Sequence, residues 1–186
     1  MQVPSGFCLF SGAYEDFLES EGLHTKIQDL VAKTDFSKSQ SISMLSNQVG
    51  QLFAYQQVPS DVIRQVSDAY EVLGCPAVAV RSSGSNEDSS QASFAGQFDS
   101  VLNVMGVASV LEAIKMVWTS TWSEAAIVYR AQFGYNQMDT LMAVVVQQLI
   151  QADVSGVMLT SDPTQVTEGR LRIESVFGLG DALVSG

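Results

Sequence analysis

Apolar side chains recur at helical spacing through the first third of the chain, in four successive stretches. The four stripes are Tyr14, Phe17 and Leu18; Leu23, Ile27, Leu30 and Val31; Ile42, Leu45, Val49, Leu52 and Phe53; and Val62, Ile63, Val66, Tyr70 and Leu73. Ser11 is placed to cap the first helix, Pro59 lies where the fourth begins, and Gly74 lies where it ends. A short apolar stretch at residues 7–10 precedes them. The pattern therefore predicts mainly helix over residues 11–75.

The pattern changes after Gly74. An apolar run at residues 77–80 predicts a buried strand that ends at Arg81, and the polar residues 82–97 predict a loop. Further strands are predicted at residues 98–104, 141–146, 154–160 and 170–177. Two helices between them have stripes at Val110, Leu111, Ile114, Val117 and Trp118, and at Ala126, Ile127, Arg130 and Phe133. The predicted fold class is α+β, with helices first and a mostly antiparallel sheet in residues 76–186.

The chain is acidic, because 20 carboxylates oppose 9 lysines and arginines and give a formal net charge of −11. Such a surface repels phosphate backbones, which argues against nucleic-acid binding. An anion site must then use particular arginines and backbone N–H groups. The 186 residues, 46% hydrophobic and 16% charged, suit one globular domain or two small lobes that share one core. The longest apolar run, residues 141–146, is too short to span a bilayer, so no membrane partner is expected.

Cys8 and Cys75 belong to no CxxC pair and have no second metal ligand near them in sequence. They are predicted to be small buried hydrophobic residues in a reducing compartment. The N-terminus has no basic region followed by an apolar run, so a cytoplasmic protein is expected. The single histidine, His24, is predicted to be an exposed helix residue.

The most informative segment begins at Arg81, where a fixed strand would deliver a guanidinium that can donate two hydrogen bonds to phosphate oxygens. The residues after it are small and polar, and Gly84 and Gly96 allow the backbone to approach a ligand closely. These are the components of a phosphate-binding loop. The same composition also suits a surface loop that binds nothing, and no Walker sequence is present.

Several segments resemble one known family in their order along the chain. They are VPSGFCLFSGAYEDFL at residues 3–18, VRSSGSNEDSSQASFAGQFDSVLNV at 80–104, VWTSTWSEAAIVYR at 117–130, VVVQQLIQADVSGVMLTSDP at 144–163 and FGLGDALVSG at 177–186. Together they resemble the pyruvate phosphate dikinase and phosphoenolpyruvate synthase family, which also includes rifampicin phosphotransferase. The resemblance covers nearly the whole chain.

The resemblance implies an ATP-grasp fold, in which ATP lies between two lobes and a glycine-rich loop covers its phosphates. Arg81 would contact the phosphates as the catalytic residue. The other residues that the resemblance places at the nucleotide are Gly96, Gln97 and Ser100 on the covering loop and its strand, Gln147, Gln148, Leu149 and Ile150 on the adenine side, and Glu174. An adenine needs hydrogen bonds along one edge and an apolar slot, which a rigid strand with Leu149 and Ile150 would provide.

Simpler interpretations stand beside these roles. Gln147 is also compatible with a polar residue at the end of a strand, and Glu174 with a residue that faces water. Arg130 is predicted to be an ion-paired scaffold residue rather than an ATP contact. Trp118 and Trp122 are predicted to pack in the core.

The family also has motifs with no counterpart here: a Gly-Gly-Lys segment ahead of the first motif, and an acidic pair and a Gln-x-Arg-Pro segment beyond the last. The resemblance therefore implies a domain that is incomplete at both ends, with Mg²⁺ ligands, a phosphohistidine domain and a substrate domain elsewhere in a parent polypeptide. Two functions remain open. One is the ATP-binding portion of a dikinase-type phosphotransferase that acts through a histidine on an acceptor such as pyruvate, and is inactive alone. The other is a catalytically inactive, free-standing nucleotide-binding or interaction module.

Overall fold

The computed structural model describes residues 3–84, 100–159, 171–180 and 183. The chain divides into two compact units, Met1–Leu149 and Ile150–Gly186, each with a sheet of its own. The described residues form helices and antiparallel strands, so the α+β prediction is confirmed. No helix in these ranges is both long and apolar enough to cross a membrane.

The first unit contains most of the secondary structure. Its elements are β1 (Gly6–Leu9), α1 (Ser11–Glu19), the short 3-10 helix η1 (Ser20–Gly22), α2 (Leu23–Ala32), α3 (Ser39–Tyr55), α4 (Ser60–Val72), β2 (Val78–Gly84), β3 (Ser100–Val104), α5 (Val107–Ser120), α6 (Glu124–Gln132) and β4 (Met142–Gln148). The second unit contains β5 (Val154–Leu159) and β6 (Arg172–Phe177), which pair antiparallel. All four predicted N-terminal helices are present.

The sheet of the first unit has the strand order β1-β4-β2-β3, and every neighbouring pair is antiparallel. The prediction that helices come first in the chain is wrong. The apolar stretch at residues 7–10 contains the edge strand β1, which pairs with β4. The strand predicted at residues 77–80 also continues to Gly84, because β4 lies beside it as far as Met142.

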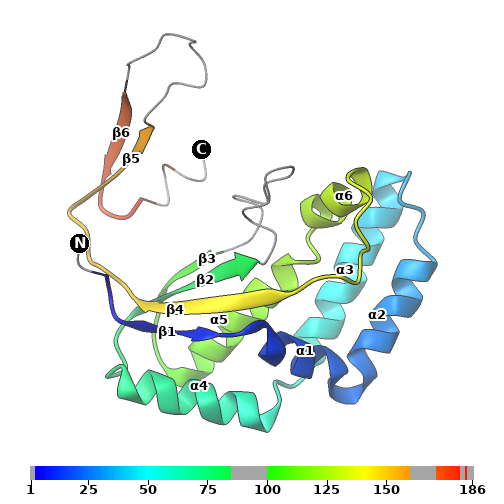
Figure 1. Cartoon of the computed structure of the whole chain (residues 1–186), viewed down its shortest axis with the longest axis horizontal. Coiled ribbons are helices and arrows are strands. Elements are labelled where there is room, and N and C mark those ends of the chain that lie inside the picture. The colour runs from blue at the N-terminus through cyan, green and yellow to red at the C-terminus, as the bar shows by residue number, and fades with distance from the viewer. Residues whose placement is uncertain (1–2, 85–99, 160–170, 181–182, 184–186) are drawn as a thin grey trace. The chain divides into compact units, whose positions relative to one another are not determined.

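The helices of the described residues pack against one face of this sheet, the covered face, and the other face is called the open face because none of these helices packs on it. Val78 and Val80 of β2 and Val144 and Val146 of β4 are fully buried on the covered face. There α5 packs against β2 and β3, and α1 packs against β4. Figure 1 shows α4 and α5 on one side of this sheet. Side chains at the alternate positions therefore point to the other, open face.

Aromatic side chains form the centre of the helical core. Phe17 of α1 lies 5.2 Å from Phe53 of α3 and 5.0 Å from Trp118 of α5, measured between ring centroids. Tyr14 lies 5.7 Å from Trp118. Trp118 and Trp122 are 0% and 1% exposed, so their predicted packing roles are confirmed.

Three local predictions are wrong. Ser11 is the first residue of α1 and does not cap it, whereas the side chain of Ser123 caps α6 by accepting a hydrogen bond from the Ala126 N–H at 3.2 Å. Cys8 and Cys75 are exposed free thiols and not buried residues. Cys8 is exposed because its position in β1 alternates with that of the buried Leu9. His24 is exposed on α2, as predicted.

The aromatic core gives a first prediction. Phe53→Ala is expected to lower the free energy of unfolding by about 3–5 kcal/mol, because the lost ring leaves a cavity between α1, α3 and α5. Tyr55→Ala on the same helix is the control, because Tyr55 is 86% exposed and its loss should change that free energy by less than about 0.5 kcal/mol. Urea unfolding measures both, and equal effects would contradict the predicted core.

Candidate functional site

One row of residues crosses the open face through all four strands. Cys8 of β1 lies opposite Val145 of β4, Val145 opposite Arg81 of β2, and Arg81 opposite Ser100 of β3. Directly opposed residues on neighbouring strands point to the same face. The structure therefore places Arg81 and Ser100 side by side, with Gln147 two residues farther along β4 on the same face.

Arg81 is the only charged residue in the four strands of this sheet. It is exposed, and its guanidinium makes no hydrogen bond or ion pair with another described residue. The prediction that the strand ends at Arg81 is wrong, because β2 continues to Gly84. Arg81 lies within the strand, and β3 and β4 pair with its backbone from both sides. The arrangement presents one cation on a rigid platform. An oxyanion on this face would find two parallel donors.

The predicted phosphate-covering loop can be compared with the structure only in part. Gly96 and Gln97 lie outside the described residues. Ser100 begins β3 and is exposed beside Arg81. The pairing of β2 with β3 is irregular between Val78 and Val80, and Asn103 opposite this irregularity has a positive φ of 57°. The hydroxyl of Ser100 and the guanidinium of Arg81 are thus the two groups of the predicted phosphate site that the structure brings together.

The end of β4 is tied to its neighbours by hydrogen bonds. The Gln147 side-chain amide donates to the Pro4 carbonyl at 3.2 Å. The Gln148 N–H donates to the Ser5 carbonyl and the Leu149 N–H to the Ala77 carbonyl, both at 2.8 Å. These three donors are therefore engaged, so the predicted adenine-side segment has fewer free groups than its sequence offers.

The Ile150 N–H and the exposed surface of the Ile150 side chain remain available for contact with a ligand. The Ile150 N–H makes no hydrogen bond with any other described residue. The Ile150 side chain is 59% exposed, and Leu149 is partly buried. Gly6 lies opposite Gln147, where a Cβ would overlap the Val146 carbonyl oxygen and come within 2.9 Å of the Gln147 Cα. Close approach of β1 to the end of β4 therefore requires glycine at this position.

Glu174 belongs to the second unit. It lies opposite Val157 in the β5–β6 pair, and its carboxylate accepts a hydrogen bond from the Arg172 Nε at 2.8 Å. Both side chains are about half exposed, so this ion pair contributes little to stability. Ile173 and Met158 lie opposite each other and point to the other face of this pair.

Arg130 is a scaffold residue, but not through the ion pair that was predicted. It is 3% exposed, and its guanidinium donates to the Gln137 side-chain oxygen at 3.0 Å and to the Thr121 carbonyl at 2.7 Å. It also lies 5.3 Å from the centre of the Trp122 ring. No carboxylate among the described residues pairs with it. Burial lowers the pKa of this guanidinium to about 10.

The same polar cluster joins distant parts of the first unit. The Tyr14 hydroxyl lies 3.0 Å from the Thr121 hydroxyl and 3.4 Å from the Thr140 hydroxyl, and it accepts a hydrogen bond from the Trp122 Nε1. Burial raises the pKa of Tyr14, so the neutral phenol is favoured. Because Thr140 lies two residues before the start of β4 at Met142, the cluster fixes the chain shortly before it enters this internal strand.

Metal binding has no support in the described part of the chain. None of its histidine, cysteine, aspartate and glutamate residues form a group of three or more that could hold an ion. The described residues therefore offer no set of ligands that fits Mg²⁺.

The sequence pattern of a family described as "Pyruvate phosphate dikinase, AMP/ATP-binding domain" matches residues 1–186. The chain belongs to this family. The resemblance inferred from the motifs is thereby confirmed, and the open face with Arg81 is a surface of an AMP/ATP-binding domain.

Curated members of the pyruvate phosphate dikinase family are similar to the chain over its full length. Rifampicin phosphotransferase of Bacillus cereus is 35% identical, and the match covers 100% of this chain and 22% of the relative. A probable phosphoenolpyruvate synthase of Archaeoglobus fulgidus is 38% identical over 99% of this chain and 25% of the relative. Phosphoenolpyruvate synthase of Aeropyrum pernix is 37% identical over 99% of this chain and 23% of the relative. The chain thus spans 22–25% of the length of these three relatives.

The Arg130 contacts give a second prediction. Arg130→Lys is expected to lower the free energy of unfolding by about 1–3 kcal/mol, because an ammonium cannot reach both the Gln137 oxygen and the Thr121 carbonyl, and one acceptor stays buried without a donor. Arg64→Lys on the surface of α4 is the matched control, with an expected change below about 0.5 kcal/mol. Equal losses in the two variants, measured by urea unfolding, would rule out the scaffold role.

Proposed function

We propose that this chain is the ATP-binding portion of a dikinase-type phosphotransferase with an ATP-grasp fold. Such an enzyme transfers a phosphoryl group from ATP to a histidine on a separate domain, and from there to an acceptor. The observation that carries the proposal is Arg81, the one charged side chain of a four-stranded sheet, which stands on the open face with Ser100 beside it. Membership of an AMP/ATP-binding family supports a nucleotide phosphate as the anion that such a group would bind.

Arg81 would act by position and charge. Phosphoryl transfer needs the phosphates to be held in place and their charge neutralised, more than it needs covalent help from the protein. A guanidinium on a strand that is paired on both sides reaches the phosphates with little loss of backbone freedom. In a chain of net charge −11, this local cation also sets where an anion can approach. In this proposal Gly96 and Gln97 cover the phosphates, and Ser100 donates its hydroxyl to them.

The base of the nucleotide would lie at the end of β4. The Ile150 N–H is free to donate to a ring nitrogen of adenine, and the Leu149 and Ile150 side chains supply apolar contact. Gln147 would support the site through its bond to Pro4, while Gln148 holds β1 in place through Ser5. Glu174 would take part only by exchanging its bond with Arg172 for one with the nucleotide.

The acceptor of the phosphoryl group is not determined by these residues. Relatives of nearly equal identity to this chain have different names, a rifampicin phosphotransferase in one case and a probable phosphoenolpyruvate synthase in another. We therefore propose that the choice of acceptor is made in a substrate domain of the parent polypeptide, and that this chain supplies ATP binding alone.

Arg81 gives the third prediction. Arg81→Ala is expected to weaken ATP binding at least about tenfold, since a lost hydrogen bond to a charged group is worth 1.5–3 kcal/mol. Because Arg81 has no partner among the described residues, the free energy of unfolding should change by less than about 0.5 kcal/mol. Calorimetric titration with ATP, with and without Mg²⁺, measures the binding.

Arg64→Ala is the matched control for this experiment, because it removes an exposed arginine from α4 and changes the net charge equally. It should leave ATP affinity within about twofold, since surface charges at a distance are screened by salt. Unchanged affinity in Arg81→Ala would refute the assignment of Arg81. Tight ATP binding with no phosphoryl transfer by the complete polypeptide would favour the inactive binding module over the phosphotransferase.

A further inference from the structure

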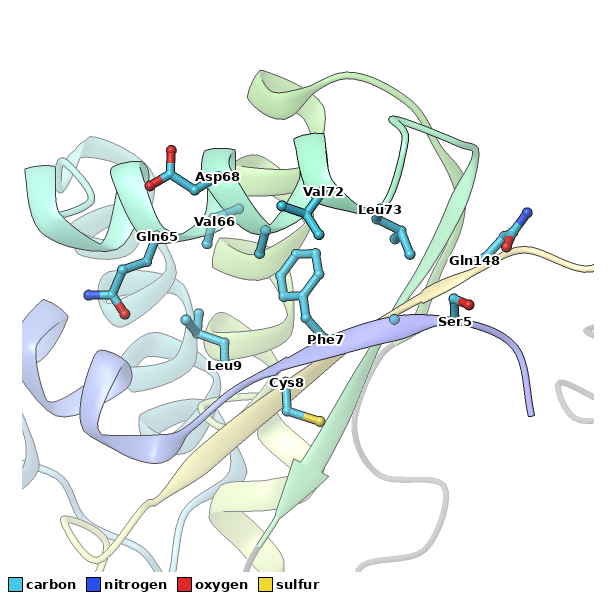
Figure 2. Close-up of a pocket in the computed structure, with 12 residues that line it drawn as sticks. Ser5, Phe7, Cys8, Leu9, Gln65, Val66, Asp68, Val72, Leu73 and Gln148 are labelled. Atoms are coloured by element: carbon cyan, nitrogen blue, oxygen red, sulfur yellow. The ribbon is translucent and has the colours of Figure 1, made fainter.

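A groove runs between the edge strand β1 and helix α4 of the first unit, and encloses about 770 Å³. Figure 2 shows the Phe7 ring and the Leu9 side chain rising from β1 toward α4. Val66, Ala69 and Val72 form the opposite wall. The groove lies on the covered side of the sheet, because Phe7 and Leu9 lie opposite the buried Val146 and Val144.

Two apolar side chains of the groove, Phe7 of β1 and Val72 of α4, are not fully covered by the helical layer of this unit. The strands β2, β3 and β4 have α5 or α1 packed against them, whereas the side chains of β1 on this face border the groove. Val72 is 90% exposed although it points over the groove, and Phe7 is only partly buried. Fully covering the Val72 side chain would stabilise the protein by about 1.5–3 kcal/mol, and covering the partly buried Phe7 would add less.

The rim of the groove is polar and partly acidic. Asp68 and Gln65 are exposed on α4 along one side, and Ser5 and Gln148 lie at one end. The residues of α4 that line the groove run from Gln65 to Leu73, a length of about 12 Å at 1.5 Å per residue. A helix of two or more turns beside α4 matches this length, and an apolar stripe on it would face Phe7 and Val72.

A second kind of occupant is also compatible with β1. The Gln148 N–H donates a hydrogen bond to the Ser5 carbonyl, and in an antiparallel ladder only every second residue pair is hydrogen-bonded. The N–H and C=O groups of Gly6 and Cys8 therefore point away from β4. An added strand would pair with these groups. It would lie beside the sheet, however, while the apolar walls of the groove lie beneath it. The geometry therefore favours a helix over a strand.

We propose that the groove holds an amphipathic helix from a longer polypeptide that contains this chain, with an apolar face on Phe7 and Val72 and a lysine or arginine near Asp68. The curated relatives are long enough to supply it, because the matched region is only 22–25% of their length. The carboxylate of Asp68 on the rim and the net charge of −11 favour a cationic helix. The proposal rests on the proposed function in taking this chain as one part of a larger phosphotransferase.

Thiol reactivity tests the proposal. Cys8→Ser and Cys75→Ser remove the two exposed thiols, and Val72→Cys then places a single thiol in the groove. Its rate of reaction with a disulfide reagent is compared between the 186-residue chain and the polypeptide encoded by the complete reading frame. The rate should fall at least about tenfold in the longer polypeptide, because a packed helix exposes a buried thiol only through local opening. Glu71→Cys is the matched control, exposed on α4 outside the groove, and should react equally in both.

Each other outcome overturns the proposal. Equal rates for Val72→Cys in the two polypeptides, or a reading frame that encodes nothing beyond residues 1–186, mean that no covering helix exists. Slow exchange of the Gly6 and Cys8 amide protons that appears only in the longer polypeptide identifies an added strand. Protection of Val72→Cys in the short chain together with a doubled mass in light scattering identifies a second copy. ATP titration of the same unmodified chain reports separately on the proposed function, so the two failures can be told apart.

Discussion

The pairing of β2 with β4 decides which side chains of the first unit reach solvent. Val80 lies opposite Val146, and both are fully buried, while Arg81 lies opposite Val145 on the other face. Because side chains alternate along a strand with a period of two, a shift of one residue would turn Arg81 toward the helices and a valine toward water. An unpaired guanidinium is far more costly to bury than a valine is to expose. The hydrophobic core therefore fixes the register, and the register fixes the position of the candidate phosphate-binding cation.

The contrast between Arg81 and Arg130 shows how the same side chain serves two purposes in one unit. Arg130 is buried, and it is tolerated there because a side-chain oxygen, a backbone carbonyl and the Trp122 ring surround it. Arg130 donates to Thr121, and Tyr14 contacts both Thr121 and Thr140, which lies two residues before β4, so this buried cation supports the chain where it approaches the strand. Arg81 has no such partner among the described residues, and it is exposed on β2, the strand that pairs with β4. Arg130 therefore stabilises the four-stranded sheet, and Arg81 is exposed on its surface.

The sequence was sufficient for the features that depend on local pattern. The stripe of α4 predicted the burial of Val62, Val66 and Tyr70, and the apolar run before Arg81 predicted β2. Features that depend on distant pairing were missed. β1 has four residues, too few to show alternation, and its partner β4 is remote in the chain. Ser82, Ser83 and Gly84 have weak strand propensity and are extended because β4 pairs with them. Motif resemblance selected Arg81, Ser100 and Gln147 separately, and only the register shows that they share a face.

Hydrogen bonding at the end of β4 shows why an adenine site cannot be assigned from a motif alone. The residues from Gln147 to Ile150 carry both side-chain and backbone donors, and the motif gives no reason to prefer one. In the folded chain the Gln147 amide and the backbone N–H groups of Gln148 and Leu149 are engaged in holding β1 and β2. A donor that already satisfies a protein acceptor can bind a ligand only by leaving that acceptor unpaired, which offsets the gain. If a base binds here as proposed, its recognition would fall to groups that the sheet leaves free, and the first backbone donor without a partner among the described residues is the N–H of Ile150, two residues beyond β4.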